Sequence, residues 1–238
     1  MREVRLVHSS DLHVDDAGTH AAPRHAASGL GGLAAVLEVA RGCAADAVLL
    51  AGDTFDNARV PGAALARAAG MIAGAGRPVV LLPGNHDAAL ADCLFHRAGL
   101  LGLANVTVLG VGREESVLFE ALGLEIWGRP HRGENALDPI GAPPPRRSRW
   151  QVAMAHGHYV PPDEWRWQAH RSWRIADAAL EAAGADYIAL GHWDRAARVG
   201  PGTVEAWYSG SPDLAGTVNI VRLGEAGVAV ERQRLTSA

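Results

Sequence analysis

Short apolar runs alternate with helically patterned segments in the first half of the chain. The runs at 4–9 (VRLVHS), 47–52 (AVLLAG) and 78–84 (PVVLLPG) each end in glycine or in a polar cluster, which is typical of buried strands. The segments between them, at 29–44 and 61–76, carry apolar residues at helical spacing. This order predicts a β-α-β-α-β unit with parallel strands and right-handed crossovers.

The second half of the chain has mostly strand patterns. Its clear helix pattern lies at 175–185, and the segments 141–149 and 161–173 have the composition of long loops. Further strands are expected at 106–110, 115–119, 122–128, 150–156, 186–192, 203–210, 216–223 and 227–235. The two halves together predict an α/β fold in which two packed mixed β-sheets are flanked by helices.

Length and composition are those of an ordinary globular protein. The chain has 238 residues, of which 48% are hydrophobic and 20% are charged, so a single domain over residues 1–238 is expected. No apolar run approaches the ~20 residues of a membrane span, and no apolar signal segment precedes the first polar cluster. We therefore expect no membrane partner and a cytoplasmic location.

Every basic residue other than histidine is an arginine, because the sequence contains no lysine. This excludes chemistry that depends on lysine, such as a Schiff base or a P-loop. The net charge is −4, yet the segment 129–174 carries eight arginines against four acids. A basic middle segment suits a substrate with a phosphate group, although for any single arginine a solvated loop position is an equal alternative.

Five polar clusters lie at the predicted carboxyl ends of strands, where the loops of an open α/β sheet form the ligand crevice. They are Asp11-Leu12-His13, Gly52-Asp53, Gly84-Asn85-His86-Asp87, His156-Gly157-His158 and Gly191-His192-Trp193-Asp194. Carboxylate, amide and imidazole groups are suitable ligands for Mn²⁺, Fe or Zn²⁺. Each cluster alone has a structural alternative, such as a turn or a buried histidine. All five in one chain predict a metal site.

The motifs SSDLH, LAGDTFDN, LPGNHD, AMAHG and LGHWD resemble, in their order and spacing, those of the calcineurin-like metallophosphoesterase superfamily. The segments YIALGH and WYSGSPDLAG resemble the SbcD-like DNA repair exonuclease branch, although the chain ends without the C-terminal capping segments of those nucleases. The resemblance extends from about Val4 to Gly216 and implies a four-layer αββα sandwich.

The resemblance also implies two divalent metal ions, which the ligand types suggest are Mn²⁺, with Fe or Zn²⁺ as alternatives. It assigns Asp11, His13 and Asp53 to the first ion, and Asp53 would bridge to the second ion. It assigns Asn85, His156 and His192 to the second ion. His86 would face the substrate phosphate, with Asp87 placed to orient it. Two ions about 3.5–4 Å apart clamp a phosphate and hold a bridging hydroxide for in-line attack. A histidine beside them stabilises the developing charge or protonates the leaving oxygen.

Asp194 departs from the family pattern, which usually has a histidine on the first ion at this position. A carboxylate there would add negative charge and make the pair of ions less electrophilic. We expect Asp194 to bind the first ion, directly or through water. The alternatives are an ion with three protein ligands and an outer role in which Asp194 pairs with Arg195 or a water.

Several aromatic and histidine side chains near these motifs have two interpretations each. Four tryptophans either form a rim that stacks on a base or aryl group or cover a core edge: Trp165, Trp167, Trp173 and Trp193. His158 is either a pocket or surface histidine or a substitute ligand.

Taken together, the motifs predict a two-metal phosphodiesterase whose substrate is nucleic acid or a small phosphodiester. The alternative is a non-catalytic metal- or phosphate-binding module that keeps the fold. Retention of the other predicted ligands and of His86 argues against that alternative, because a decayed site would have lost more of them.

Overall fold

The computed structural model describes residues 2–15, 29–112, 114–133, 138–163 and 173–236. Within these residues the strands form two six-stranded sheets and one two-stranded sheet. Two of the predicted rim residues, Trp165 and Trp167, lie outside the described residues.

The first sheet has the strand order β14-β13-β1-β2-β3-β4. Its parallel strands are β1 (Val4–Ser9), β2 (Ala47–Ala51), β3 (Val79–Leu82) and β4 (Val106–Val108). Its antiparallel strands are β13 (Thr217–Gly224) and β14 (Gly227–Arg234). The last strand of the chain is therefore an edge strand of this sheet.

The second sheet has the strand order β11-β12-β10-β7-β6-β5. Its parallel strands are β6 (Leu124–Gly128), β7 (Trp150–His156), β10 (Tyr187–Gly191) and β12 (Ala206–Ser209). Both of its edges are antiparallel and consist of β5 (Ser116–Phe119) and β11 (Ala196–Val199). The short strands β8 (His158–Tyr159) and β9 (Arg174–Ile175) form the third, two-stranded sheet.

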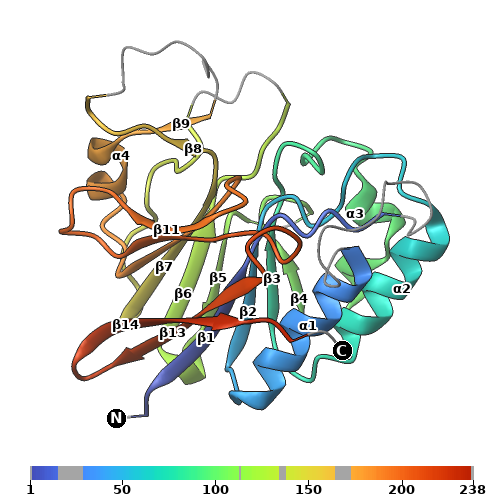
Figure 1. Ribbon diagram of the computed structural model, residues 1–238, viewed down its shortest axis with the longest axis horizontal. Helices are drawn as coiled ribbons and strands as arrows, with labels where there is room; N and C mark the ends of the chain where they lie inside the picture. The colour runs from blue at the N-terminus through green and yellow to red at the C-terminus, as the bar shows by residue number, and fades with distance from the viewer. Residues whose placement is uncertain (1, 16–28, 113, 134–137, 164–172, 237–238) are drawn as a thin grey trace.

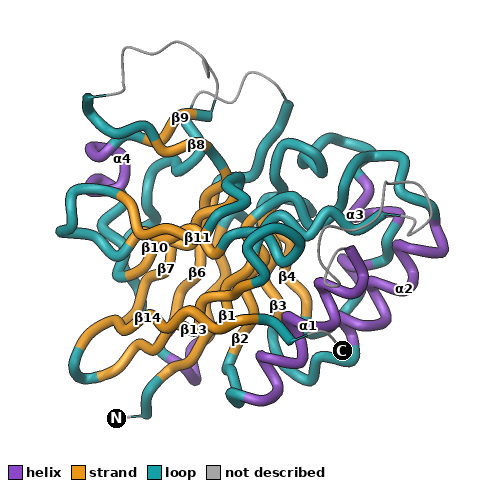
Figure 2. Tube along the Cα trace, viewed as in Figure 1, coloured by secondary structure: helices purple, strands orange, loops and turns teal. Residues whose placement is uncertain are grey.

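Helices cover the outer faces of both large sheets (Figures 1 and 2). The longer ones are α1 (Gly29–Gly42) and α2 (Gly62–Ala73), which lie against the first sheet. The second sheet is covered by α4 (Asp177–Ala182). Short helical turns occur at α3 (Leu94–Arg97), η1 (Leu100–Gly102) and η2 (Glu120–Leu122).

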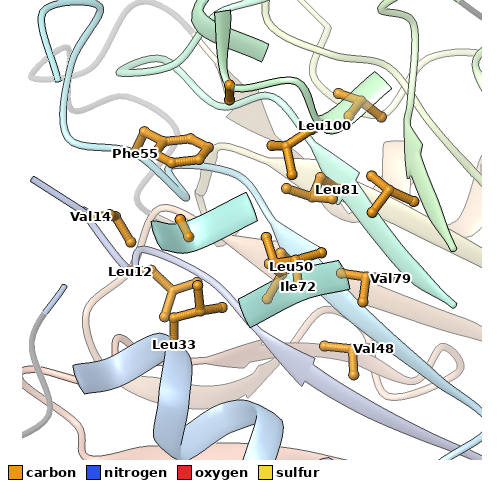
Figure 3. Close-up of a cluster of buried hydrophobic side chains, with 14 of the residues drawn as sticks. Leu12, Val14, Leu33, Val48, Leu50, Phe55, Ile72, Val79, Leu81 and Leu100 are labelled. Atoms are coloured by element: carbon orange, nitrogen blue, oxygen red, sulfur yellow. The ribbon is translucent and has the colours of Figure 1, made fainter. Parts of the chain in front are cut away.

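Alternating side chains of the central strands supply two different cores, because successive residues of a strand point to opposite faces. In β2, Val48 and Leu50 pack with Leu33 of α1 and Ile72 of α2 (Figure 3). Leu49 of the same strand belongs to the core between the two sheets. A third core lies between the outer face of the second sheet and α4. The predicted four-layer αββα arrangement is confirmed.

The structure also contains elements that the sequence patterns did not predict. These are β11, the β8–β9 pair, α3, η1 and η2. The helix predicted at 175–185 begins only at Asp177, because Ile175 pairs with Tyr159 as part of a strand. No helix within the described residues combines the length and the apolar character needed to cross a bilayer.

Candidate metal centre

The predicted site residues follow strands of both large sheets, and their loops contact one another. Asp11 and His13 follow β1, Asp53 follows β2, Asn85, His86 and Asp87 follow β3, His156 ends β7, and His192 follows β10. The backbone N–H of Asp11 donates to the carbonyl of Gly52 at 3.1 Å, and that of His13 donates to Asp53 at 3.1 Å. The carboxyl ends of the strands therefore meet at one edge. This is what the strand-end rule predicts, namely that ligands of an α/β sheet bind at the loops that follow the carboxyl ends of its strands.

The backbone at this edge adopts a conformation that L-amino acids rarely take. Asp11, His13, Asp53 and His192 have φ values of 55°, 46°, 48° and 101°. Ala44 and Trp173 are the other non-glycine residues with positive φ in the described part of the chain. Such strained positions cluster at functional sites, where the surrounding structure holds them in place.

Two glycines let the loops approach more closely than any other residue would allow. Gly52 has a φ of +90°, and a Cβ there would lie 2.0 Å from Nδ1 of His156. At Gly84, a Cβ would lie 2.2 Å from Oδ1 of Asp53. These are the glycines of the GD and GNHD motifs, so their place in the sequence has a steric cause.

The first predicted ligand set comes together as a cluster. Asp11, His13 and Asp53 each direct one potential ligand atom to a common region, and these atoms lie within 4.8 Å of one another. Both carboxyl groups are buried, with residue exposures of 4% for Asp11 and 2% for Asp53. Burial of two carboxylates side by side is costly unless a cation compensates them.

The second predicted set meets the first at Asp53. Nε2 of His156 lies 3.1 Å from Oδ2 of Asp53 and 3.1 Å from Oδ1 of Asn85. Nδ1–H of His156 donates to the carbonyl of Ala51 at 2.9 Å, which leaves Nε2 to act as the ligand atom. The His192 ring lies 5.3 Å from the His156 ring between centroids, and its backbone N–H donates to the Asp11 carboxylate at 2.9 Å.

The electrostatics of the buried groups favour a positive charge between them. Burial acts to lower the pKa of His156, but the Asp53 charge and hydrogen bond, with Asp11, raise it to about 10. Burial acts to raise the pKa of Asp53, but the charge and hydrogen bond of His156 hold it below its ordinary value. Burial, followed by the charge of His156, lowers the pKa of His192 to about 3, so this ring is a neutral donor. Carboxylate, amide and neutral imidazole donors at this spacing fit divalent cations.

His86 lies at the exposed side of this site. Its Nδ1–H donates to the backbone carbonyl of Asp56 at 2.6 Å, and its backbone N–H donates to Oδ1 of Asp53 at 2.9 Å. The ring packs edge-on against His13, with centroids 4.7 Å apart. The Asp56 carbonyl thus fixes one side of the imidazole and leaves Nε2 for contact with a substrate.

Asp87 has a different contact from the predicted one. Its carboxylate accepts hydrogen bonds from the backbone N–H of Gly84 at 2.7 Å and of Phe55 at 3.1 Å. The contact to the His86 ring comes from the backbone carbonyl of Asp56, and an orienting role of Asp87 stays a prediction. Burial, followed by the charge of Asp53, raises the pKa of Asp87 to about 7. Asp87 ties the β3 loop to the β2 loop beneath the site.

Asp194 is exposed, and neither cluster of potential ligand atoms in the described residues includes it. Its backbone carbonyl accepts a hydrogen bond from the Ser211 N–H at 3.1 Å. Ligation by Asp194 stays a prediction.

His158 accepts a hydrogen bond from Nε1–H of Trp193 at 2.9 Å, and Trp193 stacks on Tyr208 with centroids 4.4 Å apart.

Two residues near the site were not among the predicted ones. Asp56 forms a second cluster of potential ligand atoms with His13 and His86, and its position in the motif GDTFD was the available signal. His131 is buried behind the site, and its Nε2–H donates to the carbonyl of His156 at 2.6 Å. It lies in the loop that follows β6, so the strand-end rule applied to that strand would have identified it.

A family model described as calcineurin-like phosphoesterase matches residues 4–195. The chain belongs to this family, which implies metal-dependent hydrolysis of phosphoesters and in general two bound divalent ions. No curated protein matches the sequence.

Solved structures share the fold at low sequence identity. The protein TT1561 of Thermus thermophilus is 11% identical with a TM-score of 0.61, over 99% of this chain and 100% of that one. A candidate 5′-nucleotidase from Staphylococcus aureus, solved with alpha-ketoglutarate, is 13% identical with a TM-score of 0.64. That similarity covers 100% of this chain and 55% of the other. These structures support the fold, and the resemblance to the SbcD-like branch stays a prediction.

Proposed function

We propose that the protein is a two-metal phosphodiesterase. The observation that carries this proposal is the position of Asp53, whose ligand atoms reach both predicted sets. It clusters with Asp11 and His13, and it lies 3.1 Å from Nε2 of His156. A carboxylate shared between two sets of donors is the arrangement that a pair of ions requires.

When bound, the two ions would supply Lewis acidity to the substrate phosphate and activate a water for in-line attack. The first would be held by Asp11, His13 and Asp53, and the second by Asp53, Asn85, His156 and His192. We include Asp194 as an additional ligand of the first ion, directly or through water. Mn²⁺ suits this mixed set of donors, and Fe and Zn²⁺ are alternatives.

The protein's own side chains provide positioning and proton transfer. Ala51 holds the proton of His156 on Nδ1, so that Nε2 faces Asp53 and Asn85. Asp56 accepts from Nδ1–H of His86, so Nε2 of that ring is the atom that meets the phosphate. In its cationic form, His86 stabilises charge on the phosphoryl oxygens or donates the Nε2 proton to the leaving oxygen.

A hollow beside the site supports a substrate with groups on both sides of the phosphorus. It has a volume of about 850 Å³ and is lined by His192, Trp193 and Arg195 among others. This suits a diester, either in nucleic acid or in a small molecule, better than a bare monoester. The motifs YIALGH and WYSGSPDLAG support the same choice.

The test is a comparison of three substrates with the metal-reconstituted protein. They are bis(p-nitrophenyl) phosphate, p-nitrophenyl phosphate and single-stranded DNA. We expect a higher kcat/KM for the diester than for the monoester. Turnover of the monoester alone would overturn the phosphodiesterase assignment, and metal binding without turnover of any of the three would support a non-catalytic binding module instead.

A further inference from the structure

The edge strands β14 and β11 of the two large sheets border a common hollow. Its volume is about 500 Å³, and it is lined by residues from β11, β13 and β14 and from the segments that precede β11 and β13. In Figure 1, β11 lies above β14 on the same side of the molecule. Among the described residues, none from the two clusters of potential ligand atoms lines this hollow.

Three arginines line this hollow, and they are Arg195, Arg232 and Arg234. Arg232 and Arg234 are exposed and two residues apart on β14, so they point to the same face of the strand. Within the described residues, none of the three has an ion pair or a hydrogen bond from its guanidinium. One carboxylate, that of Asp194, lines the same hollow, so positive charge is in excess there.

Two other arginines, on β11 and on the strand beside β14, are already paired with acids. Arg222 of β13 contacts Glu231 at 2.7 Å, and Arg198 of β11 contacts Glu205 at 2.7 Å. The contrast shows that unpaired guanidinium groups concentrate at the hollow rather than along the whole edge.

Arg195 is held in place without the use of its hydrogen-bond donors. Its guanidinium carbon lies 4.7 Å from the centroid of the Trp193 ring, which also stacks on Tyr208. Stacking uses the face of a guanidinium and leaves its N–H edge for an anion, and that edge matches the oxygens of a phosphate.

The hollow is connected to the metal centre through the same arginine. Asp194 and Arg195 also line the larger hollow, which His192 borders on the side of the metal centre. A ligand with one phosphate beside His192 can therefore extend past Arg195 toward Arg232 and Arg234.

We propose that Arg195, Arg232 and Arg234 form a second phosphate subsite, which selects substrates that carry another phosphate beside the scissile one. This subsite rests on the proposed function and specifies its substrate class. Its ligand is the phosphate group itself, supplied either by the neighbouring nucleotide of a strand or by a polyphosphate chain.

The kinetic test uses two chromogenic substrates that differ by one phosphate. Thymidine 5′-(p-nitrophenyl phosphate) is assayed with and without a 3′-phosphate, using the Mn²⁺-loaded wild type, Arg195→Gln and Arg232→Gln/Arg234→Gln. We expect the wild type to have the lower KM for the substrate with two phosphates. The ratio of the two KM values should move toward one by about threefold to tenfold in each variant, the size of loss expected for exposed charge-assisted contacts.

The matched control is Arg222→Gln, which removes a paired arginine from the neighbouring strand and should keep the wild-type ratio. An unchanged ratio in Arg195→Gln, or the same change in Arg222→Gln, would overturn the subsite.

A binding experiment distinguishes failure of the subsite from failure of the proposed function. Thymidine tetranucleotide and inorganic tripolyphosphate are titrated by calorimetry into chelator-treated wild type, Arg195→Gln and Arg222→Gln. Weaker binding to Arg195→Gln, with wild-type affinity in Arg222→Gln, supports the subsite even if no substrate is hydrolysed. The ligand whose affinity decreases identifies the source of the phosphate. Equal affinities in all three proteins for both ligands would overturn the subsite whatever the enzyme activity.

Discussion

Nε2 of His156 lies 3.1 Å from Oδ2 of Asp53, and this contact joins the two sheets at the candidate metal centre. Asp53 follows β2 of the first sheet, and His156 ends β7 of the second. The ligand sets are therefore complete only when the two sheets pack correctly, so metal binding and folding of the sandwich are expected to be coupled.

Substitution of His86 separates catalysis from metal binding. His86→Ala removes the side chain that we propose faces the substrate and should lower kcat by roughly 10²–10⁴, the usual range for a lost general acid or charge stabiliser. Two metal equivalents should still bind. Asp53→Asn should instead weaken metal binding, because it removes charge from the proposed shared ligand. Calorimetric metal titration with kinetics on both variants checks the roles, which would be reversed if His86→Ala lost metal and Asp53→Asn kept it.

Asp87→Ala should act through the loops and not directly on the chemistry. The change leaves the buried backbone N–H groups of Gly84 and Phe55 without their acceptor, and each such loss costs about 1–3 kcal/mol. We expect a lower free energy of unfolding in urea and weaker metal affinity. The exposed Asp92→Ala is the matched control. Wild-type stability combined with a reduced kcat would support the orienting role that the sequence suggested.

The role of Asp194 is tested by two variants with opposite expected results. If the carboxylate binds the first ion, Asp194→Ala should weaken one metal equivalent, while the ion held by Asn85, His156 and His192 stays bound. Asp194→His should keep both equivalents, since imidazole is the usual ligand at this position in the family that the motifs resemble. Titration of metal into each protein counts the equivalents. Two equivalents at wild-type affinity in Asp194→Ala would assign Asp194 an outer role.

Buried His8 predicts a pH dependence of stability. Burial lowers its pKa to about 3 in the folded protein from about 6.5, and its Nδ1 lies 2.9 Å from the hydroxyl of Tyr187. Below pH 6.5 the unfolded chain binds a proton on His8 that the folded protein excludes. The free energy of unfolding therefore decreases as the pH falls below 6.5. This histidine should account for about 2 kcal/mol of the loss between about pH 7.5 and about pH 5.

The measurement for His8 is urea unfolding of the chelator-treated protein at both pH values. His8→Asn should show a smaller loss of unfolding free energy between them than the wild type. The exposed His96→Asn serves as the control and should keep the wild-type difference. An equal loss of unfolding free energy between the two pH values in His8→Asn and wild type would show that His8 takes up a proton within the fold.

The strand-end positions of the site could be predicted because they depend on local sequence. Buried apolar runs such as AVLLAG define a strand, and the polar residues that follow it must lie at the carboxyl edge. The same rule predicts that Asp11, Asp53 and His192 lie at one edge of the sandwich. The order of strand and helix patterns predicted two packed sheets with helices outside, and the resemblance to the family implied the four-layer αββα arrangement.

Features that depend on tertiary contacts could not be predicted in the same way. One of the two partners of Asp87 is the backbone N–H of Phe55 in another loop, and no spacing in the sequence encodes that contact. The short strand β11 lacks an alternating pattern and forms because β12 offers it a free edge. Arg195 and Arg232 are distant in sequence, and they share a hollow only because β11 and β14 are edges on the same side of the sandwich.

The most direct test of the proposed function is turnover of bis(p-nitrophenyl) phosphate before chelation, after chelation and after metal is restored. Mn²⁺ should restore the rate best, because the donor set combines carboxylate, amide and imidazole groups. The account predicts loss of turnover once metal analysis shows no bound ion, and its recovery as two equivalents bind. Undiminished turnover in excess chelator, with the metal content verified as nil, would contradict it.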